Sequence, residues 1–270
     1  MRKRVSLGKS LAIVTGAAGG IGFQFSKELA SRGCNLILID IDEKRLQEAK
    51  STLEKDSKEI RIETLRLDLT AEDMITTLED FCKEKDLTPD ILINNAGIFS
   101  FKPIADTERK KIEIFVDLHV RAVTLLSQWF VSVRLPYESG WMLNMSSMSC
   151  WMPMPGLAMY ASTKSYIRVF TRALHYEMKD LGIGVTVACP GGIATDLFGL
   201  PENLKKLAVN LGVLATPEKF ASKATDQMLK KKKQYINGFL NRISIFFVGI
   251  MPTPVRMMVK RRLLDKGISR

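Results

Sequence analysis

The chain has 270 residues, which is enough to bury a substantial core in one large α/β domain or two small ones. Its apolar content of 46% and charged content of 26% are ordinary for a soluble globular protein. The four cysteines lie far apart in the sequence, at Cys34, Cys82, Cys150 and Cys189. This spacing suggests neither a disulfide framework nor a zinc site, so we expect no metal and a reducing, cytoplasmic compartment.

The net charge of +11 is concentrated near the C-terminus. From Lys205 onward there are 15 Lys/Arg and 3 Asp/Glu, whereas the preceding part holds 25 and 26. A basic C-terminal quarter on a nearly neutral body indicates binding to an anionic surface such as lipid headgroups, or to nucleic acid. Alternatively, it serves only solubility. Nucleic acid is not an expected partner, because the sequence shows no recognised module or aromatic–basic platform for it.

The chain opens with Met1-Arg2-Lys3-Arg4 and an apolar stretch, which imitates a signal peptide. The apolar run Leu11–Val14 is short, however, and it leads directly into a glycine-rich segment. We therefore expect the first strand of the domain here and no targeting segment.

Apolar, β-rich runs then alternate with amphipathic stretches along the chain. Six runs predict buried strands: Leu11–Thr15, Asn35–Ile39, Ile60–Leu67, Ile91–Asn94, Trp141–Met145 and Gly184–Ala188. Several are nearly continuous in Leu, Ile and Val, as in strands that are covered on both faces. The stretches between them predict helices: Ile21–Arg32, Glu43–Lys55, Ala71–Lys85, Arg109–Val133 and Tyr160–Leu181.

Strict alternation of strand and helix implies βαβ units. The predicted fold class is therefore α/β, with a doubly wound parallel sheet in a single Rossmann-type domain over residues 1–270. Residues 197–270 are expected to form a substrate loop and a basic, amphipathic C-terminal segment. The helix over Tyr160–Leu181 is apolar on more than one side, which favours contact with a second subunit in a homodimer or homotetramer.

The first predicted strand leads into a glycine-rich segment, Thr15–Gly22, that opens the first helix. Glycines there permit a tight turn, let backbone N–H groups approach a pyrophosphate, and let the helix pack on the sheet. A glycine-rich string alone more often makes a plain turn. The strand before it and the helix after it favour a phosphate loop for a dinucleotide.

Asp40 ends the second predicted strand, eighteen residues after Gly22. A carboxylate there can accept both ribose hydroxyls of NAD, and it would repel the 2′-phosphate of NADP. No Arg or Lys lies in the glycine-rich segment to neutralise such a phosphate. NAD is therefore the expected cofactor, although Asp40 by itself is also consistent with a turn residue at a strand end.

From roughly Lys9 to Asp196 the sequence resembles the short-chain dehydrogenase/reductase family. Five motifs occur in the family's order and spacing: Thr15, Gly16, Gly20 and Gly22; Asp68-Leu69; Asn94-Asn95-Ala96-Gly97; Ser147, Tyr160 and Lys164; and Pro190-Gly191-Gly192-Ile193-Ala194-Thr195. The resemblance implies an enzyme that interconverts alcohols and ketones. It also implies these cofactor-binding residues: Gly16, Gly20, Ile21, Gly22, Asp40, Asp68, Leu69, Asn94, Asn95, Tyr160, Lys164, Ile193 and Thr195.

The chemistry explains the Ser-Tyr-Lys set. A secondary alcohol loses hydride only as its hydroxyl proton leaves, and a ketone accepts hydride only as its oxygen gains a proton. Tyr160 is expected to be this acid and base, with its pKa lowered by the ammonium of Lys164 one helical turn away and by the nicotinamide cation. The resemblance further implies that Lys164 holds the nicotinamide ribose and that Ser147 hydrogen-bonds the substrate oxygen.

His119 departs from the family's pattern. The family usually carries Asn in an Asp-x-Asn-x-x-Gly stretch, which here reads Asp117-Leu118-His119-Val120-Arg121-Ala122. That Asn is thought to hold a water linking the Lys to solvent. His119 is therefore a candidate catalytic residue that keeps a proton relay and adds its own pH dependence. The alternative is a buried, hydrogen-bonded helix residue.

Two features bear on the substrate. Six of the 13 methionines surround Ser147: Met142, Met145, Met148, Met152, Met154 and Met159. Met adapts to irregular apolar ligands, so those that do not serve core packing favour a bulky apolar substrate. Ile243–Met251 is apolar but far shorter than the ~20 residues needed to span a bilayer, and apolar residues interleaved with cations follow from Arg256 to Arg262. This pattern is typical of a segment that binds anionic lipid, with a substrate lid as the alternative.

The sequence thus predicts an oxidoreductase that transfers hydride between NAD(H) and a secondary alcohol or ketone. The expected substrate is lipid-like, such as a 3-ketoacyl, sphingoid or steroid compound. The alternatives are an NAD(H)-binding sensory or regulatory protein with little catalysis and a dehydrogenase of a small polar alcohol. We expect a cytoplasmic protein in peripheral contact with an anionic membrane.

Overall fold

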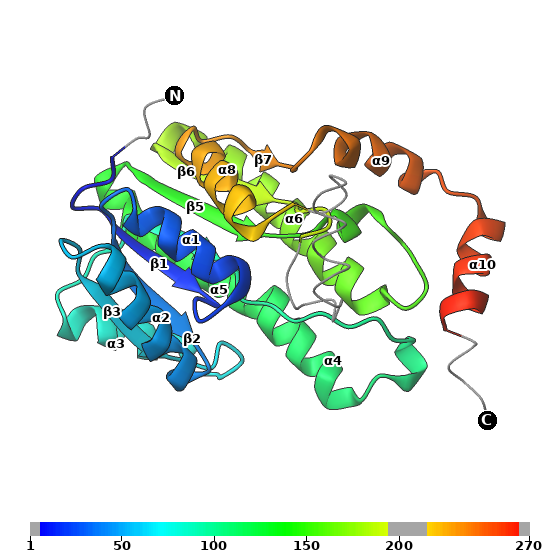
Figure 1. The fold of residues 1–270 in the computed structure, drawn as a ribbon, viewed down its shortest axis with the longest axis horizontal. Coiled ribbons are helices and arrows are strands. Elements are labelled where there is room, and N and C mark those ends of the chain that lie inside the picture. The colour runs from blue at the N-terminus through cyan, green and yellow to red at the C-terminus, as the bar shows by residue number, and fades with distance from the viewer. Residues whose placement is uncertain (1–5, 194–214, 265–270) are drawn as a thin grey trace.

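The computed structural model describes residues 6–193 and 215–264. Seven parallel strands form one sheet in the order β3-β2-β1-β4-β5-β6-β7 (Figure 1). The strands are β1 (Leu11–Thr15), β2 (Asn35–Asp40), β3 (Ile62–Arg66), β4 (Ile91–Asn94), β5 (Gly140–Met145), β6 (Ile183–Ala188) and β7 (Gln234–Tyr235). The predicted α/β fold with a doubly wound parallel sheet is confirmed.

Helices cover both faces of this sheet. One face carries α1 (Gly20–Ala30), α2 (Glu43–Asp56) and α8 (Pro217–Leu229), and the other carries α3 (Met74–Glu84), α5 (Ala122–Arg134) and α6 (Ala158–Met178). Successive strand residues point to opposite faces, so Val14 joins the first core and Ile13 the second. Burial on both sides explains the continuous apolar runs of the strands.

The helix predicted over Arg109–Val133 is interrupted in the structure. It consists of α4 (Arg109–Val116), a five-residue π-helical turn η2 (Asp117–Arg121) and α5. The π turn contains His119, which is fully buried. A π turn inside a longer helix often marks a functional site, so the interruption directs attention to His119.

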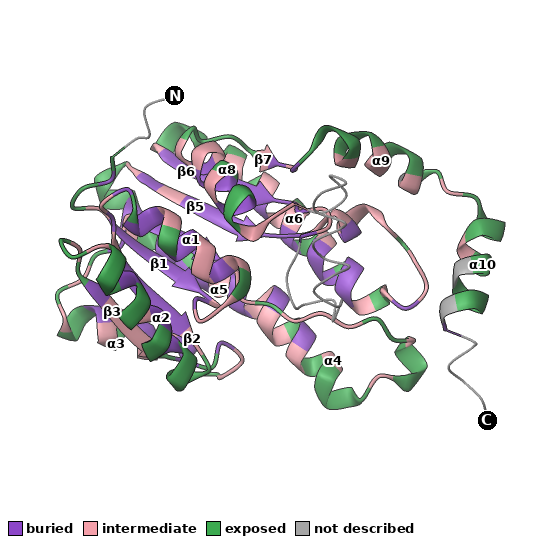
Figure 2. Cartoon of the chain, in the orientation of Figure 1, coloured by how far each residue is buried: buried purple, intermediate pink, exposed green. Residues whose placement is uncertain are grey.

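Four elements of the C-terminal quarter did not follow from the sequence pattern: β7, α8, α9 (Phe239–Gly249) and α10 (Thr253–Leu263). β7 has two residues, too few for a strand periodicity, and it follows the exposed run Lys230–Lys233. The two last helices lie beyond β7 at the far end of the molecule (Figure 1). They are mostly exposed, in contrast to the buried strands (Figure 2).

Two other sequence expectations concern surfaces. Among the described residues, Arg109–Tyr137 forms a helical stretch apolar and long enough to cross a bilayer, but half of its most apolar window is buried inside the molecule. On α6, Val169 and Tyr176 are 62% and 56% exposed, so the side expected against a second subunit is open in the single chain. The homo-oligomer stays a prediction.

Candidate functional site

The glycine-rich loop joins β1 to α1 and is shaped by backbone conformations that suit glycine. Gly16 and Gly20 have φ of +65° and +54°, in the left-handed region. A Cβ at Gly22 would overlap the carbonyl oxygen of Gly16 and would lie 2.6 Å from Asn95 Nδ2. Since α1 begins at Gly20, its unpaired N–H groups point toward this loop. The arrangement is a cradle that fits a phosphate group.

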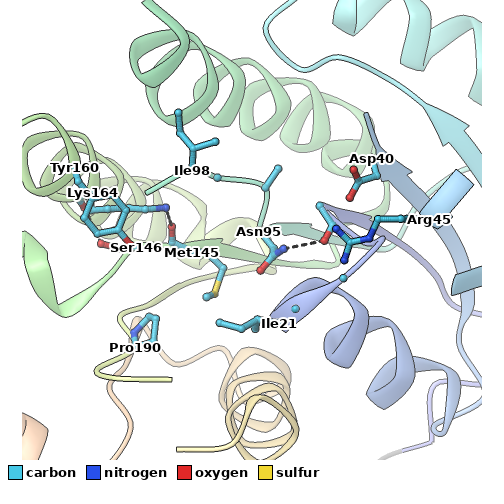
Figure 3. A pocket seen from close by; sticks show the side chains of 15 residues that line it. Ile21, Asp40, Arg45, Asn95, Ile98, Met145, Ser146, Tyr160, Lys164 and Pro190 are labelled. Carbon is cyan, nitrogen blue, oxygen red and sulfur yellow. Dashed lines mark hydrogen bonds between the residues drawn. The ribbon is translucent and has the colours of Figure 1, made fainter. Parts of the chain in front are cut away.

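Asn95 fixes the loop after β4 against the loop after β1. Its Nδ2 donates to the carbonyl oxygens of Thr15 and Gly16 at 3.0 and 3.3 Å (Figure 3). In return, Thr15 Oγ1 accepts the backbone N–H groups of Asn95 and Ala96 at 3.0 and 3.1 Å. β1 and β4 are neighbours where the strand order reverses, which is where ligands bind in open α/β sheets.

Asp40, at the end of β2, lies beside the glycine-rich loop. Its Oδ2 accepts the Ala18 N–H at 3.0 Å, and its Oδ1 accepts the Asp42 N–H at 3.2 Å. Arg45 reaches back from the first turn of α2 and occupies the space that a Cβ at Gly19 would need. Figure 3 shows Asp40 and Arg45 at the same end of one pocket. Arg45 is not among the predicted site residues, because it lies outside the glycine-rich loop, in the first turn of the next helix.

Tyr160 and Lys164, on α6, lie at the other end of that pocket (Figure 3). Lys164 Nζ is 5.8 Å from the centre of the Tyr160 ring and donates to the Met145 carbonyl at 2.9 Å. Burial lowers the pKa of Lys164 to about 8, while Cys189 acts in the opposite direction. The same spacing of four residues that the sequence showed therefore places both groups in one site.

Burial also raises the pKa of Tyr160 above its usual value, and a hydrogen bond with Ser147 acts against this shift. The lowered pKa that the sequence predicted is therefore absent from the protein alone, because loss of hydration disfavours the phenolate more than its neighbours favour it. Tyr160 is protonated at neutral pH.

Ser147 begins the short 3-10 helix η4 (Met148–Trp151), and its Oγ accepts the Ser149 N–H at 3.1 Å. It is half-buried, and it is the serine that bonds to Tyr160. The adjacent Ser146 is buried and donates instead to the Lys164 carbonyl at 2.7 Å. The two neighbouring serines thus divide their roles, since Ser147 bonds to the phenol and Ser146 holds α6 against β5.

His119 lies next to this site with both ring nitrogens engaged. Nε2 accepts the Ile98 N–H at 3.0 Å, and Nδ1 is 3.0 Å from Thr163 Oγ1. Because Nε2 accepts, the ring is neutral with its proton on Nδ1. Burial, reinforced by the charge of Lys164, lowers its pKa to about 2. These contacts favour the buried, hydrogen-bonded alternative for His119 and leave no titration of its own near neutral pH.

The pocket that joins these groups has a volume of about 390 Å³. Seven of the predicted cofactor residues line it: Gly16, Gly20, Ile21, Asp40, Asn95, Tyr160 and Lys164. It is one continuous space from the phosphate cradle to Tyr160. The described residues contain no group of three or more His, Cys, Asp or Glu that could hold a metal ion.

The remaining predicted cofactor residues lie elsewhere. Asp68 is exposed, and its Oδ1 accepts from the backbone and hydroxyl of Thr70 at 2.9 and 2.7 Å. Leu69 is buried in the core between the sheet and α3 and α5. Neither residue is among those that line the pocket.

Asn94 and Ile193 are buried near the pocket without lining it. Asn94 Nδ2 donates to Asn144 Oδ1 at 2.9 Å, so its side chain serves a polar network between β4 and β5. Ile193 forms a bridge with Ala215 and packs in the core. Thr195 lies outside the described residues.

An aromatic side chain packs against Tyr160. The Phe99 ring meets the Tyr160 ring edge-on, with 5.0 Å between centres. Of the six methionines singled out in the sequence, Met142 and Met145 are buried in the two cores. The other four, in η4 and before or at the start of α6, are partly exposed: Met148, Met152, Met154 and Met159. Core packing therefore accounts for part of the cluster, as the sequence analysis allowed.

Comparisons with known proteins agree with this geometry. The family model described as short chain dehydrogenase matches residues 10–203. An uncharacterised oxidoreductase of Staphylococcus saprophyticus is 30% identical over 72% of this chain and 83% of its own length. The human inactive hydroxysteroid dehydrogenase-like protein 1 is 28% identical over 89% and 72%. The very-long-chain 3-oxoacyl-CoA reductase of Macaca fascicularis is 29% identical over 85% and 71%.

Solved structures share the fold at lower identity. A short-chain dehydrogenase of Sphingobium yanoikuyae in complex with NADPH has a TM-score of 0.76 at 23% identity, covering 94% of this chain and 96% of its own. The bulky-bulky ketone specific alcohol dehydrogenase of Comamonas testosteroni has a TM-score of 0.74 at 22% identity, with the same coverage. A 4-hydroxyisoleucine dehydrogenase complexed with NADH also reaches 0.74 at 22% identity, covering 84% and 96%.

Proposed function

Because the chain belongs to the short-chain dehydrogenase/reductase family, and is thus an NAD(P)-dependent oxidoreductase of alcohols and ketones, we propose that it uses NAD(H) on a bulky apolar substrate. One observation carries the proposal. A single pocket has a glycine cradle and Asp40 at one end and Tyr160 with Lys164 at the other. A dinucleotide needs such a space, with a phosphate site between a ribose partner and the reacting groups.

The residues of the pocket fit this cofactor. The backbone around Gly16, Gly20 and Gly22 would hold the pyrophosphate, and Asp40 would accept the hydroxyls of the adenine-side ribose. Lys164 would hold the nicotinamide-side ribose. When bound, the cofactor donates or accepts the hydride.

Arg45 is the group that opposes the preference for NAD. Its guanidinium lies at the Asp40 end of the pocket, where it suits a 2′-phosphate, whereas the Asp40 carboxylate repels one. Asp40 is held by the Ala18 N–H of the loop and by the Asp42 N–H that follows it, while Arg45 is an exposed side chain of α2. The fixed carboxylate supports NAD.

In the proposed reaction Tyr160 holds the proton at Oη and gives it to the ketone oxygen. Ser147, which bonds to the phenol, would donate to the same substrate oxygen and position it. The Lys164 ammonium, 5.8 Å from the ring centre, stabilises the phenolate that remains. Burial raises the pKa of Tyr160, so the phenol carries the proton that this step needs at neutral pH.

An apolar substrate is supported by the surroundings of Tyr160. Phe99 forms an aromatic wall beside the phenol, and four partly exposed methionines lie on the segment that carries Ser147 to α6. Such a surface offers few hydrogen bonds to a sugar or polyol. The similarity to a very-long-chain 3-oxoacyl-CoA reductase points in the same direction.

A second candidate is a protein that binds NAD(H) and turns over little substrate. It is favoured by the hydrogen bond from Lys164 to the Met145 carbonyl. This bond competes with the roles of Lys164 in binding the ribose and stabilising the phenolate. The similarity to a human relative named as inactive also supports it. The intact Ser147, Tyr160 and Lys164 set favours the first candidate.

One paired assay decides between them. Binding and turnover of NADH and NADPH would be measured with a panel of apolar and polar ketones, with Tyr160→Phe as the control. NADH-dependent reduction of apolar ketones that is lost in Tyr160→Phe supports the proposal. Tight NADH binding without turnover on either panel supports the second candidate, and a preference for NADPH contradicts the role given to Asp40.

A further inference from the structure

The helix α9 differs from a helix packed on a protein body, because it exposes large apolar residues. Its large apolar residues are exposed and fall on one stripe: Phe239, Leu240, Ile243, Phe246, Phe247 and, at the C-cap, Ile250. Phe239 is 75% exposed and Phe246 67%. The opposite side is half-buried and carries Asn241, Ser244, Ile245 and Val248.

The side of α9 opposite the stripe faces the protein, and it carries both polar and apolar residues. Asn241 Nδ2 donates to the Asn237 carbonyl at 2.8 Å, and its side chain lies against Gly191, leaving no room for a Cβ there. Asn237 Oδ1 accepts the Gly191 N–H at 2.7 Å. Asn241 thus packs α9 against the loop after β6 while the apolar stripe faces outward, which marks that stripe as a binding surface.

A second feature adjoins the start of this stripe. A cavity of about 440 Å³ between α8 and α9 is lined by three cations, Lys223, Lys230 and Arg242, together with Phe239. Asp226 is the carboxylate among its lining residues, and that group is bound to Arg32 at 2.8 Å. An apolar ridge beside a cluster of cations matches the boundary between acyl chains and anionic headgroups.

We propose that α9 docks the protein onto an anionic bilayer, with the apolar stripe inserted among the acyl chains and Lys223, Lys230 and Arg242 receiving lipid phosphates. Its 11 residues extend about 16 Å, short of the ~30 Å hydrocarbon core, so the helix lies in the plane of the interface. α10 follows at an angle of 102° and ends with Lys260, Arg261 and Arg262. These cations extend the basic surface beyond α9.

Charge decides against a second copy of this chain as the occupant. Lys223, Lys230 and Arg242 lie beside the stripe, and a second copy packed on the same face would bring the same three cations to it. Like charges at one interface repel, whereas an anionic surface neutralises them.

The docking surface also lies next to the candidate active site. Asn241 and Asn237 hold Gly191, which follows the pocket residue Pro190. Leu264, which directly follows α10, is buried against Gly156, and Gly156 precedes Tyr160 by four residues. Contact with a bilayer would therefore bring the entrance beside Tyr160 close to dissolved apolar substrate. This route rests on the proposed function, whereas the docking itself does not.

The test is co-sedimentation of the full chain with vesicles of phosphatidylcholine alone or mixed with phosphatidylserine, at low and high ionic strength. We expect retention on the mixed vesicles that salt weakens. The double variant Phe246→Ser/Phe247→Ser should weaken binding by on the order of tenfold for each ring. Lys223→Gln/Lys230→Gln should weaken it about fivefold for each cation.

Matched controls are Leu135→Ser, an exposed apolar residue away from α9, and Lys44→Gln/Lys55→Gln on α2, both expected to bind as the unaltered chain does. Equal binding of the α9 variants and their controls would overturn the proposal. So would self-association that the Phe246→Ser/Phe247→Ser change abolishes in the absence of vesicle binding, since that assigns the stripe to a second copy. Ketone reduction measured in detergent reports separately on the proposed function.

Discussion

The strands around the glycine-rich loop bury their side chains on both faces, whereas α9 turns its largest side chains outward. Ile13, Val14 and Ile37 are fully buried, and Phe239 and Leu240 are almost three-quarters exposed. Both regions are equally apolar in sequence, so apolar content does not separate them. Their place in the fold does, because helices cover both faces of the strands whereas the stripe on α9 is exposed. The strands form the packed interior, whereas the exposed stripe of α9 is the surface that we propose to contact a bilayer.

The largest expected effect disrupts the packed interior. Gly22→Ala places a methyl group into the carbonyl oxygen of Gly16, so α1 must move away from the loop. We expect the free energy of unfolding to fall by about 1–3 kcal/mol and NADH binding to weaken at least as much. Urea denaturation and fluorescence titration measure the two quantities. Gly8→Ala is the control, since a Cβ there meets Ser6 Oγ at 3.8 Å, an ordinary contact; equal effects of both changes would contradict the explanation.

Substitutions of His119 test whether the π turn contributes to stability and to activity. His119→Leu leaves the half-buried Ile98 N–H without its acceptor and removes one hydrogen bond of Thr163. We expect a loss of about 1–3 kcal/mol in the free energy of unfolding and much of the activity, because Lys164 packs nearby. His119→Asn retains a polar group and should keep most of the activity. Full, equal activity in both variants would remove His119 from the mechanism.

The pH profile sharpens the role of the buried Lys164. Its pKa of about 8 means that the ammonium is present below this pH and is lost above it. Ketone reduction needs Tyr160 protonated and Lys164 charged, so kcat/KM should be level below pH 8 and fall about tenfold per unit above it. Lys164→Arg should move the fall to higher pH. A break near pH 6.5 would instead show that His119 titrates, against its lowered pKa.

The preference between NADH and NADPH tests the opposite effects of the hydrogen-bonded Asp40 carboxylate and the exposed Arg45 guanidinium. Asp40→Ser should raise the kcat/KM ratio of NADPH to NADH by on the order of tenfold, because the repulsion of a 2′-phosphate is lost. Arg45→Ala should lower that ratio by a similar factor. Lys44→Ala, the exposed neighbour of Arg45, is the control for general charge effects. No change in Asp40→Ser would show that the loop does not select the cofactor.

The smallest expected effect is at the outward surface. Phe247→Ser should change the free energy of unfolding by no more than about 0.5 kcal/mol, since the ring is 61% exposed. Thermal unfolding without lipid measures this. A loss comparable to that of Gly22→Ala would mean that the stripe is covered in solution, in conflict with its role as a free docking surface.

Much of the fold and half of the site followed from local pattern. Strands β1 to β6 were predicted to within a few residues, because strands buried on both faces have continuous apolar sequences, whereas the two-residue β7 was not predicted. Tyr160 and Lys164 were placed together by their spacing on one helix, and Gly16, Gly20 and Asp40 by the order of strand, loop and strand. Arg45 was missed, since its approach to Gly19 depends on how α2 folds back over the loop.

The sequence alone determined which groups exist and which neighbours on one helix or loop share a site: the glycine cradle, the Tyr160–Lys164 pair and the basic C-terminal quarter. Tertiary structure decided what each group experiences. In the folded chain His119 is neutral, with a hydrogen bond at each ring nitrogen, and burial raises the pKa of Tyr160. The fold also decides which side of α9 is exposed. The physical reason is that periodicity reports geometry along the chain, whereas hydration and hydrogen-bond partners depend on segments far apart in sequence.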